Sequence, residues 1–192
     1  MRKLIAALFL VALGAVQAQA AGTIDLDLND ESVQARFTVP LVLYDQGSSE
    51  FNGRVLYNDD EDLTLGSMGL DFLGQPAQVP GLTLGVGAEV LGGEKEDPVK
   101  DQNFLSLAAG ARLSYNPPVL SALGFHAHIF YAPKVLSFLD TNRVRETAVR
   151  VSYTIIPQAD IFLEYQNVHM DFEDIGDHTV DDELRIGFLG RF

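Results

Sequence analysis

Hydrophobic and polar residues alternate along most of the chain after residue 22, and the alternation is clearest at the end, over Glu183–Phe192. Every second residue of that segment is apolar or small: Leu184, Ile186, Phe188, Gly190 and Phe192. Successive side chains of a β-strand point to opposite faces, so this pattern predicts a strand with one apolar face and one mostly polar face.

Ten segments of the chain alternate in this way, and several have about the 9–11 residues that a tilted transmembrane strand needs. They are Thr23–Asn29, Ser32–Val39, Phe51–Tyr57, Leu63–Phe72, Leu82–Leu91, Phe104–Tyr115, Ala122–Tyr131, Val144–Ile155, Asp160–Met170 and Glu183–Phe192. Proline cannot donate to a strand ladder, and we expect all eight prolines to lie between these segments. The prolines are Pro40, Pro76, Pro80, Pro98, Pro117, Pro118, Pro133 and Pro157.

The connections between the segments fall into two unlike sets. One set is charged and mostly long: Asn58–Asp62, Gly92–Asn103, Ala132–Arg143 and Asp171–Asp182. The opposite set is short, uncharged and rich in proline: Gly74–Gly81, Asn116–Ser121 and Ile156–Ala159. Bacterial outer-membrane barrels have short periplasmic turns and longer outer loops, so the first set is predicted to face outward from the cell.

The polar face of the strands carries charges of both signs. In a barrel this face lines the interior, and the predicted lumen residues are Arg36, Arg54, Glu89, Arg112, His126, His128, Glu146, Arg150, Glu164 and Arg185. Side chains largely fill the interior of a barrel of eight to ten strands, so a near-balanced set of charges predicts an ion-pair network or a narrow channel. A β-sandwich would bury the apolar face instead, and the alternation alone does not separate the two architectures.

The start of the chain favours export. Met1-Arg2-Lys3 is basic, Leu4–Val16 is apolar and Ala18-Gln19-Ala20 fits a cleavage site, so residues 1–20 are predicted to be a signal peptide and residues 21–192 the mature domain. Without Arg2 and Lys3 the chain has 11 basic residues against 27 acidic ones, a net charge of −16. Such an acidic chain is not expected to bind nucleic acid, whose affinity comes from basic residues. Cysteine is absent, so no disulfide forms.

The terminal Phe192 after an alternating strand resembles the C-terminal signature of bacterial outer-membrane proteins. We therefore predict an all-β fold: a single antiparallel transmembrane β-barrel of about ten strands, or eight if the first two segments are irregular. The expected partners are outer-membrane lipid, lipopolysaccharide, and the barrel-assembly machinery acting through the strand that ends at Phe192. The expected location is the bacterial outer membrane.

Several longer stretches resemble the YfaZ family of outer-membrane proteins. They are Leu82–Glu89, Phe130–Phe138, Val151–Tyr153 followed by Ile156–Ala159, and the Phe192 ending. The resemblance covers nearly all of the mature chain and implies an outer-membrane barrel in a Gram-negative bacterium. It implies no catalytic or ligand-binding residues, and a fold by itself supplies no function.

Three places are candidates for chemistry. His126 and His128 share the inward face of one strand, where they are expected to hydrogen-bond to carboxylates and could alternatively bind a metal or protons. Asp177 and His178 lie in an acidic outer loop, where a rim enzyme that hydrolyses lipid or peptide would place an acid–base pair. The clusters Asp59-Asp60-Glu61-Asp62 and Glu94–Asp97 offer oxygen ligands for divalent cations, although solvated loops are the preferred interpretation.

The predicted function is that of a small outer-membrane barrel with a structural or envelope role, or a narrow pore for small solutes or ions. A rim enzyme and a soluble periplasmic binding protein are the alternatives. The sequence predicts no cofactor and no dedicated metal site.

Overall fold

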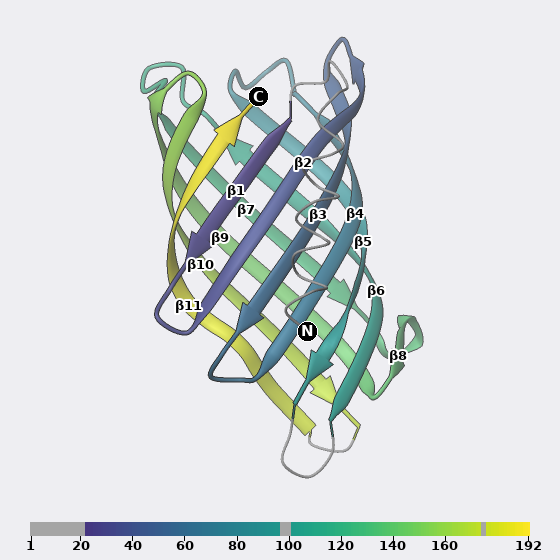
Figure 1. Ribbon diagram of the computed structural model, residues 1–192. Helices are drawn as coiled ribbons and strands as arrows, with labels where there is room; N and C mark the ends of the chain where they lie inside the picture. The colour runs from purple at the N-terminus through teal and green to yellow at the C-terminus, as the bar shows by residue number, and fades with distance from the viewer. Residues whose placement is uncertain (1–21, 97–100, 174–175) are drawn as a thin grey trace.

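The computed structural model describes residues 22–96, 101–173 and 176–192, so the predicted signal peptide lies outside the described residues. Ten long antiparallel strands form the wall (Figure 1). They are β1 Thr23–Leu28, β2 Ser32–Tyr44, β3 Gly47–Asn58, β4 Leu63–Gly74, β5 Leu82–Lys95, β6 Gln102–Tyr115, β7 Leu123–Ala132, β9 Thr141–Ile156, β10 Ala159–Phe172 and β11 Gly176–Arg191. A one-turn 3-10 helix η1, Lys134–Leu136, and a short strand β8, Ser137–Leu139, lie between β7 and β9. Within the described ranges, no helix is long and apolar enough to cross a membrane.

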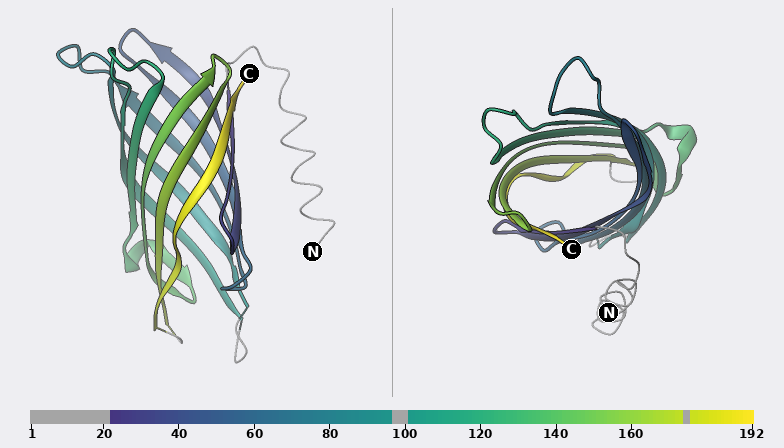
Figure 2. Two further views of the ribbon diagram at one scale, coloured as in Figure 1. Left: turned by 90° about the vertical axis from the view of Figure 1, so that its left-hand side faces the viewer. Right: turned by 90° about the horizontal axis from the view of Figure 1, so that it is seen from above.

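The sheet closes on itself. Each strand pairs with its neighbours in the chain, and β11 returns to β1 with the register Thr23↔Arg191 to Leu28↔Ile186. Two further backbone hydrogen bonds, of 2.9 and 3.0 Å, join Gly22 and Phe192. Seen along its axis the wall is an oval ring (Figure 2). Closure satisfies the backbone without a free edge, which is what a sheet in lipid requires. The predicted ten-stranded antiparallel barrel is therefore confirmed.

Most strands run further than predicted, and two of these extensions correct details of the prediction. Pro40 lies inside β2 rather than between strands, at a register shift between Pro40 and Val42. The bulge removes the need for an N–H donor at that position, so proline is tolerated. Similarly, β11 begins at Gly176, so Asp177–Asp182 belongs to a strand and not to a loop. A second register shift, between Val168 and His169 of β10, accompanies this extension.

The outer wall is an apolar belt. Large hydrophobic side chains on it are about half exposed, because no part of the protein covers them: Val86, Ile129, Val149, Leu163 and Ile186 are examples. Tyr57, Tyr131 and Tyr165 stand on the outer wall toward the end opposite the C-terminus. Tyrosine suits the border between lipid and water, because its ring is apolar and its hydroxyl polar. The belt and its aromatic edge are the exterior of a membrane-spanning barrel.

Candidate functional site

The inward side chains divide the lumen into an apolar layer, a charged layer and an open chamber. The end that carries Phe192 and the short turns is periplasmic by the rule for bacterial barrels, so the opposite end is extracellular.

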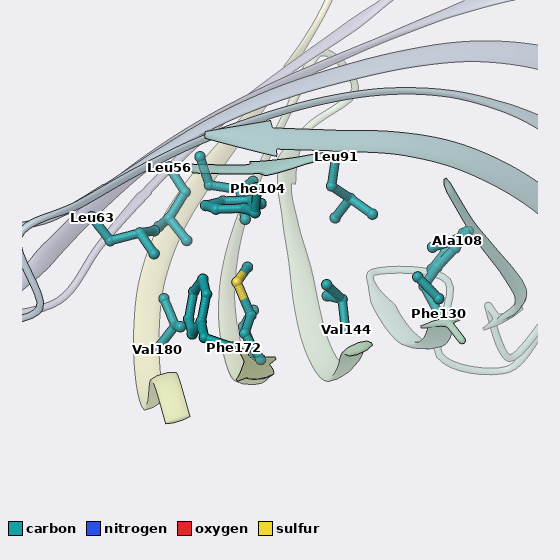
Figure 3. Close-up of a cluster of buried hydrophobic side chains, with 13 residues drawn as sticks. Leu56, Leu63, Leu91, Phe104, Ala108, Phe130, Val144, Phe172 and Val180 are labelled. Atoms are coloured by element: carbon teal, nitrogen blue, oxygen red, sulfur yellow. The ribbon is translucent and has the colours of Figure 1, made fainter. Parts of the chain in front are cut away.

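A plug of apolar side chains fills the extracellular half of the lumen (Figure 3). Its members come from eight strands, and each is at most 2% exposed. They are Leu56, Leu63, Leu65, Leu91, Phe104, Ala108, Phe130, Ala132, Val144, Val168, Met170, Phe172 and Val180. Side chains this inaccessible leave no room for water between them. We call this set the apolar plug.

An ion pair crosses the lumen directly below the plug. Arg54 of β3 contacts Glu146 of β9 through two bonds, Nη1 to Oε1 at 2.5 Å and Nη2 to Oε2 at 2.6 Å. His128 Nε2 lies 3.0 Å from the same Oε1. Glu89 is 5% exposed near this pair, and its Oε1 has no hydrogen-bond partner among the described residues. Two parallel bonds between opposite charges form one of the stronger polar contacts in a protein interior.

A second network closes the side of the lumen next to β1 and β2. Arg185 is fully buried and donates from Nη1 to Asp27 at 3.1 Å and from Nη2 to Asp181 at 2.8 Å, with a further bond to the Ser32 hydroxyl. Gln34, also fully buried, donates to Asp27. Several buried charges thus partner one another, as the near-balanced signs of the inward residues predict.

The periplasmic half of the lumen is an open chamber of about 480 Å³, which we call the vestibule. On one side, Arg150 binds Glu164 at 2.6 Å and Asp25 at 2.8 Å, and Arg36 lies 3.4 Å from Glu164. On the other side, Asp71 accepts a hydrogen bond from Asn52 at 2.6 Å and lies 2.9 Å from Arg112. The vestibule is therefore polar, of nearly balanced charge, and closed at its inner end.

The structure places the two inward histidines in different surroundings. His128 faces the carboxylate of Glu146, whereas His126 lies between two hydroxyls, Ser114 Oγ at 3.0 Å and Ser152 Oγ at 3.2 Å. The expectation of a carboxylate partner was wrong for His126, because Ser114 faces it on β6 and the Ser152 hydroxyl reaches its ring from the position on β9 that pairs with Gly124. All ten side chains named for the lumen lie inside the barrel wall.

The structure separates Asp177 from His178. Adjacent residues of a strand point to opposite faces, and both residues lie in β11. The Asp177 carboxylate is 3.3 Å from His169 Nε2 on the outer wall, whereas the His178 ring packs against Phe172, a member of the plug. His169 also lies 3.3 Å from the Thr179 hydroxyl. The structure therefore does not bring Asp177 and His178 together as a pair.

The run Asp59–Asp62 forms the turn between β3 and β4. The Asn58 side chain accepts from the backbone N–H groups of Asp60 and Glu61 at 3.0 Å each, which fixes the turn. In the part of the chain that the structure describes, no three Asp, Glu or His residues are grouped to hold a metal ion. Asp97 of the second acidic cluster lies outside that part.

An acidic depression of about 190 Å³ lies at the extracellular rim and includes Glu61, Asp181 and Glu183. Glu183 belongs to the polar face of β11 but is half-buried above the β1–β2 turn. Desolvation and the neighbouring carboxylates of Glu31 and Asp30 raise the pKa of Glu183. The rim is therefore a place of like-charge repulsion.

The sequence matches the family model described as YfaZ precursor over residues 1–192, which is the whole chain. The chain belongs to the YfaZ family. The description as a precursor agrees with an exported protein, and the closed barrel with its apolar belt places this YfaZ protein in the outer membrane. No curated protein matches the sequence.

Several solved outer-membrane proteins have similar folds at low identity. The channel DcaP of Acinetobacter baumannii is 14% identical, with a TM-score of 0.48 over 88% of this chain and 54% of DcaP. The KdgM porin is 10% identical, with a TM-score of 0.43 over 90% and 99% of the two chains. The outer-membrane protease OmpT of Escherichia coli is 12% identical, with a TM-score of 0.45 over 90% and 91%. The architecture of the YfaZ chain rests on its own strand pairing.

The apolar plug was not predicted from the sequence. A signal for it does exist, because the alternation fails where the plug forms: Val90 and Leu91 are both apolar, as are Ile129 and Phe130. One residue of each pair faces lipid and the other the lumen. A strand segment that is apolar on both faces indicates a filled interior at that height.

Proposed function

We propose that this YfaZ protein is a sealed structural barrel of the outer membrane that does not conduct solutes. The apolar plug is the observation that carries this proposal. Residues such as Leu56, Leu91 and Met170 are fully buried inside the lumen, so they do not line a water-filled channel. Open porins have 16–18 strands and an aqueous channel, whereas side chains can fill a barrel of about eight strands.

The alternative of a narrow pore requires a continuous polar path. The charged layer and the vestibule would supply the periplasmic part of such a path, but the plug interrupts it. Asp177 and His178 point to opposite faces of β11, which argues against the rim enzyme. The observations favour a barrel with acidic loops on the outside and, on the periplasmic side, a chamber that is closed at its inner end.

A liposome swelling assay tests the proposal. The purified protein is folded into vesicles, its folding is checked by heat-modifiable gel mobility, and the vesicles are placed in an iso-osmotic solution of a small sugar such as arabinose. We expect no swelling beyond that of empty vesicles, while an open porin in parallel vesicles swells them. Swelling that scales with the amount of folded protein would contradict a sealed barrel.

A further inference from the structure

Arg112 differs from the other inward arginines. Arg54, Arg150 and Arg185 each donate at least two hydrogen bonds to carboxylates. Arg112 donates none to any residue within 22–96, 101–173 and 176–192: its Nε is 2.9 Å from Asp71 Oδ2 but is not aligned for a bond. Its guanidinium lies over the Phe130 ring at 4.9 Å and its side chain is 24% exposed to the vestibule. Arg112 is therefore ion-paired with Asp71 through Nε, while its terminal nitrogens donate no hydrogen bond to the described residues.

The strand beside Arg112 has only glycine at its neighbouring inward positions, so side chains from β4 lie over it. Two inward glycines of β5, Gly85 and Gly87, separate Arg112 on β6 from Asp71 on β4. A Cβ on Gly87 would lie 2.0 Å from Asp71 Oδ1, so only glycine lets this carboxylate lie across the strand. Beyond Asp71, Glu50 on β3 occupies the paired register position. We call this stretch of the vestibule wall, with the Arg112 guanidinium at one end, the Glu50 carboxylate at the other and Asp71 between them, the trough.

The Glu50 carboxylate also has binding capacity left. Its Oε1 accepts from the Ser48 hydroxyl at 2.9 Å, and the residue is half-buried among those that line the vestibule. An ionised carboxylate has about four acceptor positions, so most of them face the chamber. Arg112 and Glu50 thus lie in one cavity, have opposite charge, and keep hydrogen-bonding positions that Asp71 and Ser48 do not use.

We propose that the vestibule binds a small zwitterion from the periplasm, of the chemical class of a free amino acid or a dipeptide. The ligand carboxylate is held by the terminal nitrogens of Arg112, in the two-pronged geometry that a guanidinium favours. The ligand ammonium is held by Glu50. The volume of about 480 Å³ lies within the range of pockets for small molecules.

The charges of the trough select a zwitterion over a simple ion. A polyanion would meet Asp71 and Glu50 near the arginine, and like charges at short range are repelled. A simple cation would leave the donors of Arg112 unpaired. A molecule with both groups satisfies both ends of the trough and carries no net charge into it.

This inference does not depend on whether the barrel conducts. The vestibule opens to the periplasm and ends at the charged layer, so a ligand can bind there with or without a path through the plug. A conducting barrel would therefore contradict the proposed function without contradicting the zwitterion site. Failure of zwitterion binding would contradict the site without contradicting the sealed barrel.

Calorimetric titration of the detergent-folded protein tests the site with three probes: dialanine, dialanine amide, which lacks the carboxylate, and N-acetyl-dialanine, which lacks the ammonium. We expect dialanine to bind and each of the other two to bind at least roughly tenfold more weakly, because each leaves one charged hydrogen-bonding group unpaired. Absence of dialanine binding, or equal binding of all three probes, would overturn the proposal.

Variants assign the two ends of the trough. Arg112→Gln should weaken dialanine binding at least roughly tenfold and leave the already weak binding of dialanine amide unchanged. Glu50→Gln should likewise weaken dialanine binding at least roughly tenfold and leave the already weak binding of N-acetyl-dialanine unchanged. Arg145→Gln, an exposed arginine of β9 on the outer wall, is the matched control and should bind dialanine as the unmodified protein does. Equal losses for all probes in Arg112→Gln would indicate a structural role and overturn the assignment.

A labelling-protection experiment tests the site without calorimetry. The chain has no cysteine, so Ser114→Cys places a single thiol beside His126 in the vestibule. A water-soluble maleimide should label this thiol, and dialanine should slow the labelling several-fold while dialanine amide does not. If dialanine at saturating concentration leaves the labelling rate unchanged, the ligand does not occupy the vestibule.

Discussion

Arg54 and Glu146 join opposite walls of the barrel. Their strands, β3 and β9, are five positions apart in either direction around the ring, and the two bonds between the side chains measure 2.5 and 2.6 Å. Both side chains are at most 4% exposed. The pair therefore acts as a strut across the lumen, directly beneath the apolar plug.

Removing one end of this strut should destabilise the barrel. Glu146→Gln leaves Arg54 as a buried charge without its carboxylate, a change that costs about 3–5 kcal/mol. Urea unfolding in lipid vesicles, followed by heat-modifiable gel mobility, should show a lower midpoint. Glu173→Gln, at an exposed carboxylate, is the control and should not shift it. Replacing both partners, as Arg54→Met with Glu146→Leu, should recover much of the loss; an unchanged midpoint for Glu146→Gln would contradict the strut.

Some large inward side chains pack directly against the backbone of glycine residues. A Cβ on Gly110 would lie 2.3 Å from the Ile129 carbonyl oxygen and 2.6 Å from the Phe130 ring. Gly110→Ala should therefore destabilise the barrel by about 1–3 kcal/mol through overpacking. Gly66→Ala, whose nearest atoms are 3.9 Å away, should be close to neutral in the same unfolding assay. Equal midpoints for the two variants would show that the plug is loosely packed.

The strand positions could be predicted from the sequence because a barrel wall imposes a period of two. β1, β4 and β5 begin at the predicted residues Thr23, Leu63 and Leu82. Lipid on one side and a partly polar lumen on the other maintain the alternation. Extended strand ends such as Gly92–Lys95 were not predicted, because two glycines and two charged residues interrupt the alternation there.

The contents of the lumen were harder to predict. The alternation shows which face a residue occupies, but the height of each strand relative to its neighbours depends on the stagger of the whole barrel. Arg54 and Glu146 are 92 residues apart in the chain, so nothing local pairs them. The same stagger brings Phe104 and Phe172 within ring contact, with centroids 6.3 Å apart.

The acidic rim should respond to pH. The raised pKa of Glu183 means that the folded chain holds the proton more tightly than the unfolded chain does, so this group destabilises the fold above its raised pKa. This loss of stability disappears as the pH falls below the ordinary glutamate pKa of about 4.3. Glu183→Gln should raise the thermal midpoint by about 1 °C at pH 8 and leave it unchanged at pH 4. A lower midpoint at pH 8 would contradict repulsion at the rim.

The terminal residue should matter for closure of the ring. Phe192 exchanges two backbone hydrogen bonds with Gly22, and its ring lies where a Cβ of Gly22 would be, at 2.7 Å. Deleting Phe192 should lower the folded fraction recovered from outer membranes several-fold, as seen by gel mobility. Phe188→Ala removes another outward aromatic from β11 but keeps the backbone bonds, so its folded fraction should stay close to normal. Similar losses for both variants would indicate that the rings matter and the closing bonds do not.

Planar-bilayer conductance is the measurement that tests the sealed barrel most directly. The folded protein should give no discrete openings. A plug variant, Phe104→Ala with Phe130→Ala and Phe172→Ala, should admit ions, while the outward control Phe72→Ala with Phe125→Ala and Phe188→Ala should stay silent. Discrete openings of the unmodified, fully folded protein would contradict the account, because they would show that water and ions pass the plug.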